Sequence, residues 1–338
     1  MLLNKISSKY LLLALIMMVL LSCNSDNTPD VSNINADVNI IEFYKEFDAM
    51  DSSNVESSLA TLNEKYPVFM DAYCQRIVKS GPLDGADYGK RVLAFVDYDA
   101  NKDIIDSAQH VFVDHKDFSA QLSQAFKYYK YYFPENEVPD IYLMVSGFSQ
   151  SIAVDMDWVG VSIEKYLGAD CIFYEWLEIP KYLRVGMIKE KMAPDVLRAM
   201  GLTLYPERNV NDDVISNMIY QGKIKYFVKK MFPKLENTLL FDYSKDQLRW
   251  AEKTEKDTWA AIVEWKHLFN DERMTIQKYT GDAPFSAHFG NDSAPRIGEY
   301  LGYQIIQSYM KNNPDVSLKE LMENNDGRKI LAASKYRP

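Results

Sequence analysis

The chain has 338 residues, with 38 Lys and Arg against 48 Asp and Glu, so its formal net charge at pH 7 is −10. A chain this acidic is repelled by nucleic acid and by anionic lipid, and we predict that it binds no nucleic acid. We expect any contact with a membrane to come from attached lipid rather than from the protein surface.

The N-terminus has the pattern of a bacterial lipoprotein signal. Lys5 and Lys9 form a basic region, and the apolar run over residues 11–21 is shorter than the about 20 residues that a membrane-spanning helix needs. The sequence LLSC, which ends at Cys23, has the form of a lipobox. We therefore predict a signal peptide over residues 1–22 and acylation of Cys23, with palmitate among the acyl chains.

Lipidation defines the compartment and the division of the chain. Residues 23–37 are polar, and we expect them to be an acylated tether. Residues 38–338 contain no Pro/Gly/Ser-rich linker and no repeat, and we predict that they form a single domain. Several acyl chains anchor a protein firmly. The prediction is therefore a lipid-anchored protein of the cell envelope, in the outer membrane, with the side of the membrane left open.

Cys74 and Cys171 are the two cysteines besides the acylated one. An envelope location permits a disulfide between them. Both lie in apolar stretches, where a free buried cysteine is common. The sequence leaves the two alternatives open.

Apolar spacing predicts a mainly α fold with a small β-sheet, in the α+β class. Residues 138–147 and 151–168 are rich in β-branched and aromatic residues and are separated by the turn-like GFSQ, which predicts two or three strands. Ser317 and Glu320 form the pattern of a capping box in the helical C-terminal part. Helical spacing is found over residues 38–50, 55–78, 119–134 and 179–206.

The stretch DYDANKD, which begins at Asp97, resembles a calcium-binding loop. Its oxygen-bearing residues alternate as an EF-hand requires. However, Lys102 stands where the loop needs glycine, and Ala108 stands where it needs a bidentate Glu. We interpret the stretch as a solvated turn.

The four histidines, His110, His115, His267 and His288, form no zinc-binding pattern such as H-E-x-x-H. His110 and His115 flank the apparent strand HVFVDH, which would place them on opposite faces. The chain also lacks a G-x-S-x-G motif, a Walker A loop and a G-x-G-x-x-G motif. Motifs therefore give no reason to predict an enzyme.

Residues 214–233 mix apolar residues with lysines. On a helical wheel, Lys225 and Lys229 fall inside the same arc as the apolar residues. A membrane-surface helix would instead place its lysines opposite the apolar face. We therefore predict a core helix, with the lysine stems passing along it toward solvent.

Residues 39–338 resemble the gliding-motility lipoprotein B family of Bacteroidetes, GldB. The stretches that carry the resemblance are YPVFMDAYCQRI, VPDIYLMVSGFSQSIAVDMDWVGVSIEKYLG, MIYQGKIKYFVKKMFP, QLRWAEKTEKDTWA, PRIGEYLGYQIIQSYMKNNPDVSLKELM and ILAASKYRP. The resemblance implies an envelope lipoprotein linked to gliding motility and to the type 9 secretion machinery. In non-motile members it implies envelope or secretion support.

The order of strands and helices is also similar to a family of predicted zinc peptidases, whose helices carry H-E-x-x-H and a third Glu ligand. That similarity places Pro194 and Arg198 where the His ligands would stand, Asp195 in place of the general base, and Gln221 at the third ligand. Proline, arginine and a neutral amide do not replace these zinc ligands. The similarity implies a degenerate, zincin-like scaffold that lacks its metal.

The combined prediction is a non-enzymatic lipoprotein with no cofactor, no metal and no catalytic residue, which binds envelope proteins of the gliding and type 9 secretion machinery. One alternative is an active hydrolase with an atypical site, built from Asp155, Asp157, Glu164 or Glu175. A second alternative is a surface glycan-binding lipoprotein, which 23 Tyr and 5 Trp would serve.

Overall fold

The protein is described by a computed structural model over residues 28–338. Residues 34–338 form one compact unit, to which the description below refers. The predicted signal peptide, residues 1–22, and Cys23 lie outside the described residues. Among residues 28–338, no helix is both long enough and apolar enough to cross a membrane.

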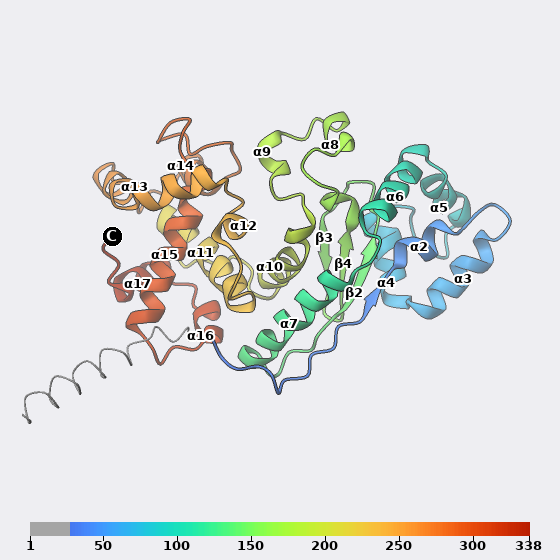
Figure 1. The fold of residues 1–338 in the computed structure, drawn as a ribbon, viewed down its shortest axis with the longest axis horizontal. Coiled ribbons are helices and arrows are strands. Elements are labelled where there is room, and N and C mark those ends of the chain that lie inside the picture. Colours follow the sequence, from blue (N-terminus) through green and yellow to red (C-terminus); the bar gives the residue numbers. More distant parts are fainter. Residues whose placement is uncertain (1–27) are drawn as a thin grey trace, which may run out of the picture. The chain divides into compact units, whose positions relative to one another are not determined.

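Helices make up most of the compact unit and surround a small sheet (Figure 1). The helices before the sheet's second strand are α2 (Phe43–Asp48), α3 (Val55–Lys65), α4 (Pro67–Ala72), the π-helix η1 (Tyr73–Ile77), α5 (Tyr88–Val96), α6 (Asp99–Val111) and α7 (Lys116–Tyr132). The later helices are η2 (Ile163–Tyr166), α8 (Ile172–Trp176), α9 (Lys181–Arg184), η3 (Lys189–Lys191), α10 (Met192–Leu204), α11 (Val214–Met231), α12 (Asn237–Phe241), α13 (Lys245–Glu264), α14 (Arg273–Thr280), α15 (Ile297–Asn312), α16 (Leu318–Glu323) and α17 (Gly327–Ser334). The predicted fold class is confirmed, as is the capping box that begins α16.

The sheet has four strands in the order β1-β2-β4-β3. Strand β2 pairs in parallel with β1 and with β4, while β3 pairs antiparallel with β4 and forms an edge. The strands are β1 (Ile40–Ile41), β2 (Asp140–Met144), β3 (Ile152–Val154) and β4 (Trp158–Ser162). The sequence predicted two or three strands and missed β1, whose two residues lie in a stretch with helical spacing and become a strand by pairing with β2.

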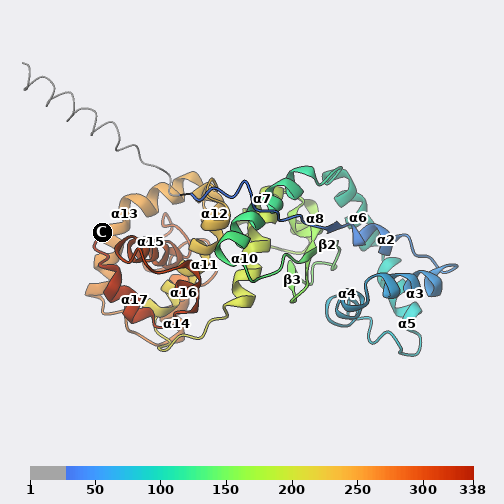
Figure 2. The same ribbon diagram turned by 90° about the horizontal axis from the view of Figure 1, so that it is seen from below.

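Both faces of the sheet are buried, as is usual for parallel strands. In β2, Ile141 and Leu143 enter one hydrophobic cluster, with α7, α10, α11 and α15, whereas Tyr142 and Met144 enter another, with α2–α5. The alternation follows from the two-residue period of a strand. Figure 2 shows α10 and α11 on the side of the sheet away from α3–α5.

Two local predictions between α5 and α7 are wrong. The proposed solvated turn over residues 97–103 is a turn at Asp97, but from Asp99 onward it is the start of α6. The apparent strand HVFVDH is the last turn of α6 together with the connection to α7. The buried residues Ile104, Ile105 and Ala108 lie on one helical face, and this spacing outweighs the short run of β-branched residues. His115 precedes α7 and bonds Glu42 through Nε2 at 2.8 Å.

Cys74 and Cys171 are both free thiols. Cys74 is buried in the hydrophobic cluster that includes α2–α5, whereas Cys171 packs against the other cluster. The sheet separates these clusters, so the disulfide alternative is not realised in this fold. Burial raises the pKa of both thiols.

Helix α11 lies in the core, as predicted, and its closest neighbour is α15. The helices meet at Gly222 and Gly302, where a Cβ on either residue would overlap the backbone of the other helix. A Cβ on Gly302 would overlap the carbonyl of Met218, for example. Only glycine permits backbones to approach this closely.

Lys223 and Lys225 on α11 are each only 3% exposed, so the prediction that the lysine stems run toward solvent is wrong for these two. The Nζ of Lys223 donates to the carbonyl oxygens of Met322 at 3.2 Å and Asn324 at 2.7 Å, at the end of α16. The last carbonyls of a helix lack helical partners, and this lysine satisfies two of them. Burial lowers the pKa of Lys223 to about 8.

Gly302→Ala should lower the free energy of unfolding by about 3 kcal/mol or more, because the added methyl meets backbone that cannot rotate away. Urea unfolding of purified protein measures this change. The control is Gly89→Ala in α5, where the tight contact is the carboxylate end of the flexible Glu56 side chain. The control should be neutral or stabilising, because alanine favours a helix over glycine by about 1 kcal/mol. Equal effects of the two substitutions would contradict the role of the glycine contact.

Stability should rise with pH between about 8 and 10.5, because Lys223 has its lowered pKa only in the folded protein and the unfolded chain binds more protons in that window. This contribution is lost as the pH falls through about 8. The rise is at most about 1.4 kcal/mol per pH unit. Urea unfolding at several pH values should show it relative to Lys223→Met, while Lys319→Met, an exposed position on α16, should follow the parent protein. Parallel pH profiles for the parent and Lys223→Met would refute the assignment.

Candidate functional site

A cavity of about 930 Å³ opens beside α10 and α11. Its walls come from β3, the segment between η2 and α10, and the turn after α14. Its other walls come from α10, α11 and the start of α15. Among the residues singled out in the sequence, Asp195, Arg198 and Gln221 all line this cavity.

Helix α10 presents Asp195 and Arg198 from one face, since residues three apart lie above one another on a helix. Gln221 comes from α11, which packs against α10. Pro194 is buried and does not line the cavity. Its position in the first turn of α10 is one where proline is tolerated, because the first helical N–H groups have no helical acceptor.

The floor of the cavity consists of Lys191, Asp195, Lys225, Asp242, Arg296 and Glu299. It contains a buried ion pair between α11 and α15. Lys225 Nζ lies 3.0 Å from Glu299 Oε2, and the two side chains are only 3% and 5% exposed. Lys225 also donates to the carbonyl oxygen of Leu240 at 2.9 Å. Burial raises the pKa of Glu299, but Lys225 and Arg296 outweigh it and hold the pKa below its usual value. Glu299 is therefore a carboxylate at neutral pH.

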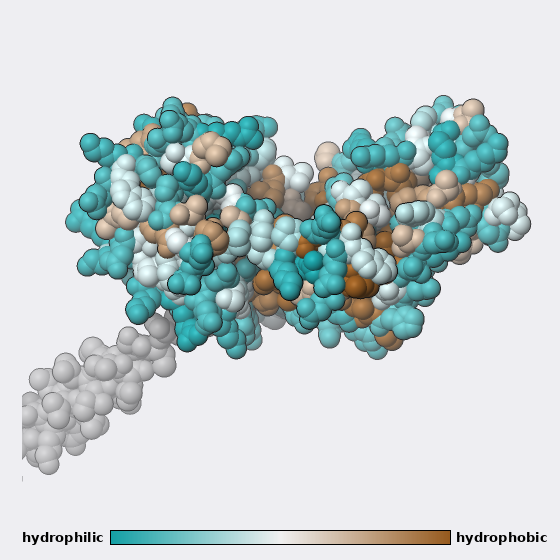
Figure 3. Space-filling model, turned by 90° about the horizontal axis from the view of Figure 1, so that it is seen from above, coloured by the Kyte–Doolittle hydropathy of each residue, from teal (hydrophilic) through white to brown (hydrophobic). Residues whose placement is uncertain are grey.

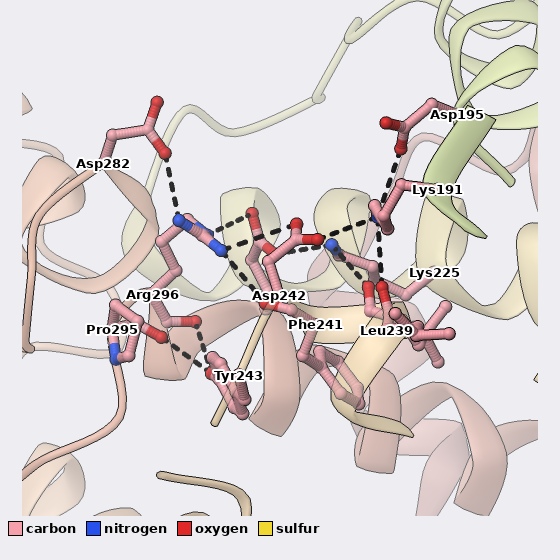
Figure 4. A network of polar contacts seen from close by, with 12 residues as sticks. Lys191, Asp195, Lys225, Leu239, Phe241, Asp242, Tyr243, Asp282, Pro295 and Arg296 are labelled. Atoms are coloured by element: carbon pink, nitrogen blue, oxygen red, sulfur yellow. Dashed lines mark hydrogen bonds and ion pairs between the residues drawn. The ribbon is translucent and has the colours of Figure 1, made fainter. Parts of the chain in front are cut away.

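Lys191 forms the second part of the floor (Figure 4). Its Nζ lies 3.1 Å from Asp195 Oδ1 and 2.8 Å from Asp242 Oδ1, and it donates to the carbonyl oxygen of Leu239 at 3.0 Å. Asp195 accepts a further hydrogen bond from the Tyr166 hydroxyl at 3.2 Å. Both oxygens of Asp195 are therefore engaged.

Arg296 connects the floor with the cavity mouth (Figure 4). Its guanidinium lies 3.1 Å from Asp282 Oδ1, 3.6 Å from Glu299 Oε1 and 3.7 Å from Asp242 Oδ2. It also donates to the carbonyl oxygen of Phe241 at 3.0 Å. Burial raises the pKa of Asp242, but Lys191, Lys225 and Arg296 together bring it below its usual value.

Arg198 and Gln221, which line the cavity from α10 and α11, are not part of this network. Within residues 28–338, Arg198 makes no ion pair, and neither the Arg198 nor the Gln221 side chain makes a hydrogen bond. Arg198 is only partly exposed, and its charge contributes to the lowered pKa of Glu299. The cavity thus has a fixed, internally bonded floor and two polar groups with unused bonding capacity.

The carboxylates of the hydrolase alternative do not gather at this cavity. Asp155 and Asp157 lie in the turn between β3 and β4, and Glu175 lies exposed on α8. Glu164, past the opposite end of β4, is buried, and its Oε1 accepts bonds from the Ser146 hydroxyl and backbone N–H groups. Burial raises the pKa of Glu164. No cluster of three or more His, Cys, Asp or Glu side chains within residues 28–338 is arranged to hold a metal ion.

Fold and cavity define a mainly helical protein with an ion-paired cleft at the edge of a small sheet. A family model described as gliding motility protein GldB matches residues 24–338. The chain therefore belongs to the GldB family of gliding-motility lipoproteins, which places its role in gliding motility at the cell envelope. No curated protein and no solved structure matches the chain.

Sequence reasoning missed the floor residues Lys191, Asp242, Arg296 and Glu299. The sequence did contain one indication of this network. A lysine inside the apolar arc of a core helix, such as Lys225, needs a buried partner of opposite charge. The partner was not identifiable from spacing, since Glu299 lies in a distant helix. The two residues come together only through the packing of α11 on α15.

Lys225→Met should lower the free energy of unfolding by roughly 3–5 kcal/mol, because it leaves the Glu299 carboxylate buried without its lysine. Combining it with Glu299→Leu should recover much of that loss, since no buried charge then remains from the pair. Urea unfolding of the single and double variants measures both. Lys90→Met, which removes the exposed pair with Asp87, is the control and should cost about 1 kcal/mol or less. If the double variant loses as much unfolding free energy as the two single variants lose together, Lys225 and Glu299 do not couple.

Proposed function

We propose that this GldB-family lipoprotein acts without catalysis, by binding an envelope protein of the gliding or type 9 secretion machinery in the cavity. It is held at the outer membrane by acyl chains on Cys23. The observation that carries the proposal is that Asp195, Arg198 and Gln221 converge on one cavity whose floor is fixed by internal ion pairs. Such a floor is suited to recognising a ligand rather than to moving protons, because its charges already neutralise one another.

The edge strand β3 gives the cavity a means of holding an extended segment. Ser151 and Ile152 line the cavity, and β3 pairs with β4 on one side only. In an antiparallel pair, alternate residues direct their N–H and C=O groups away from the partner strand. A peptide added along that edge would gain backbone hydrogen bonds that do not depend on its sequence.

The rim of the cavity supplies apolar contacts that would add affinity. Leu177 lines the cavity and is 49% exposed, and it follows directly on α8, where Ile172 and Trp176 are also exposed. Figure 3 shows apolar side chains gathered on the face that includes α8. Exposed aromatic and aliphatic anchors of this kind are typical of protein-binding surfaces.

The same arrangement supports descent from a metallopeptidase scaffold. An edge strand, a first helix with Asp195 and Arg198, and a second helix with Gln221 surround one cleft, as the similarity to predicted zinc peptidases implies. Arginine is permanently cationic and repels a metal ion. In this proposal the peptide-binding cleft is retained, while the metal chemistry is lost.

Site-specific crosslinking in intact cells tests the proposal. A photoreactive residue at Leu177 should crosslink to an envelope protein, because this position lies at the cavity rim. The control is Val263 on α13, which is 47% exposed and does not line the cavity. Absence of a crosslink specific to Leu177 would overturn the binding role. Stoichiometric zinc in the purified protein, or its turnover of a peptide, would overturn the non-enzymatic role.

A further inference from the structure

Arg198 differs from the other cations at the base of the cavity. Lys191, Lys225 and Arg296 each contact at least one carboxylate within 3.1 Å and at least one backbone carbonyl. Arg198 has no such contact within residues 28–338, although it lines the cavity. A guanidinium carries five N–H donors, and those of Arg198 are unused by the protein.

The charges around Arg198 define what it could bind. The cavity lining as a whole is neutral, with five cations, Lys165, Lys191, Arg198, Lys225 and Arg296, and five carboxylates, Glu178, Asp195, Asp242, Asp282 and Glu299. Among the four cations at its base, Arg198 is the one that forms no ion pair within residues 28–338, since Asp282 pairs with Arg296. A ligand with a single negative charge would neutralise Arg198.

The rim restricts the ligand further. Glu178 and Asp282 are exposed carboxylates at the cavity mouth, and Lys165 is a partly buried cation there. The ammonium of Lys165 already lies over the ring of Phe148, 5.4 Å from its centroid. Because Asp282 is paired with Arg296 and the lining carries no net charge, a second negative charge on the ligand would gain no net attraction. This favours a carboxylate over a phosphate group.

Gln221 offers a second polar side chain to the same cavity. It faces the same cavity from the adjacent helix α11, and its side-chain amide makes no hydrogen bond within residues 28–338. A planar guanidinium donates two parallel hydrogen bonds to a carboxylate, and an amide N–H₂ is a neutral third donor. The two groups with unused bonding capacity thus suit the same ligand group.

We propose that Arg198 and Gln221 bind one carboxylate of a peptide ligand in the cavity, with Arg198 as the charged donor. The carboxylate belongs either to the C-terminus of the peptide or to an acidic side chain. This inference rests on the proposed function, because it names the ligand class of the same cavity. In this proposal the preference for an anion comes from Arg198, which aligns with a zinc ligand of the similar predicted peptidases.

Titration calorimetry with defined peptides tests the inference on the purified mature protein. The probes are acetyl-tetra-alanine as the free acid, the same peptide as its C-terminal amide, an amidated peptide with one central Glu, and inorganic phosphate. We expect saturable binding of the free acid or of the Glu peptide, and whichever binds identifies the source of the carboxylate. We expect the affinity of the neutral amide to be lower by about tenfold or more, because a charge-assisted hydrogen bond is lost.

Variants test whether the peptide binds in the cavity at Arg198. Arg198→Gln should weaken the carboxylate peptide about tenfold or more, and Arg198→Lys should restore only part of the affinity, because lysine keeps the charge but not the paired donors. Arg208→Gln, an exposed arginine outside the cavity, is the matched control and should bind as the parent does. Circular dichroism and urea unfolding would show that each variant is folded.

Three outcomes would overturn the inference: no saturable binding of either carboxylate peptide, phosphate binding as tightly as the carboxylates, or equal affinities of the Arg198→Gln and parent proteins. The crosslink from Leu177 separates this result from the proposed function. If Arg198→Gln leaves that crosslink unchanged and the carboxylate effect is absent, the cavity binds a partner without the carboxylate contact. If the crosslink itself is absent in the parent protein, the proposed function fails.

Discussion

The contact of Gly222 with Gly302 is the constraint on which the cavity depends. It brings α11 and α15 together at backbone distance, and no side chain separates them there. Lys225 lies one turn beyond the first glycine, and Glu299 lies one turn before the second, so the same approach places the two charges 3.0 Å apart. A wider spacing would leave both charges buried and apart, which is far more costly than the pair itself.

Two other residues of the floor have strained backbone conformations, which are held in place by the packing around them. Asp242 and Arg296 both adopt left-handed backbone conformations, with φ of 57° and 47°. Such conformations cost of order 1 kcal/mol or more for a residue with a Cβ, and they persist where surrounding bonds determine them. Here Lys191 fixes Asp242, while the carbonyl of Phe241 and three carboxylates fix Arg296. Left-handed residues held in place by a buried polar network are often found at functional sites.

The elements that could be predicted from sequence were those in which local pattern and tertiary environment agree. Helix α11 was correctly placed in the core because its lysines were not segregated from its apolar residues, and the sheet was recognised from its β-branched residues. The predictions for strand β1 and for the segment around His110 were wrong, because strand pairing and packing override a short local pattern there. The ion-pair network could not be predicted, because its members come from separate helices and turns and their proximity is a property of the packing. Asp195, Arg198 and Gln221 were proposed from resemblance, and no spacing rule would have selected them.

The structure shows that Asp195, Arg198 and Gln221 differ in their bonding, which the resemblance alone does not reveal. Asp195 is bonded to Lys191 and Tyr166 and belongs to the floor, while Arg198 and Gln221 remain open to the cavity. In the descent that we propose, an arginine at this point would do more than replace a metal ligand, because it supplies a cation that forms no ion pair within residues 28–338. A scaffold with a cation bound at its centre attracts electron-rich groups, and a fixed guanidinium retains that preference without a metal ion. In the proposed function, the lack of a metal ligand at Arg198 and the preference of the cleft for an anion would therefore follow from the same residue.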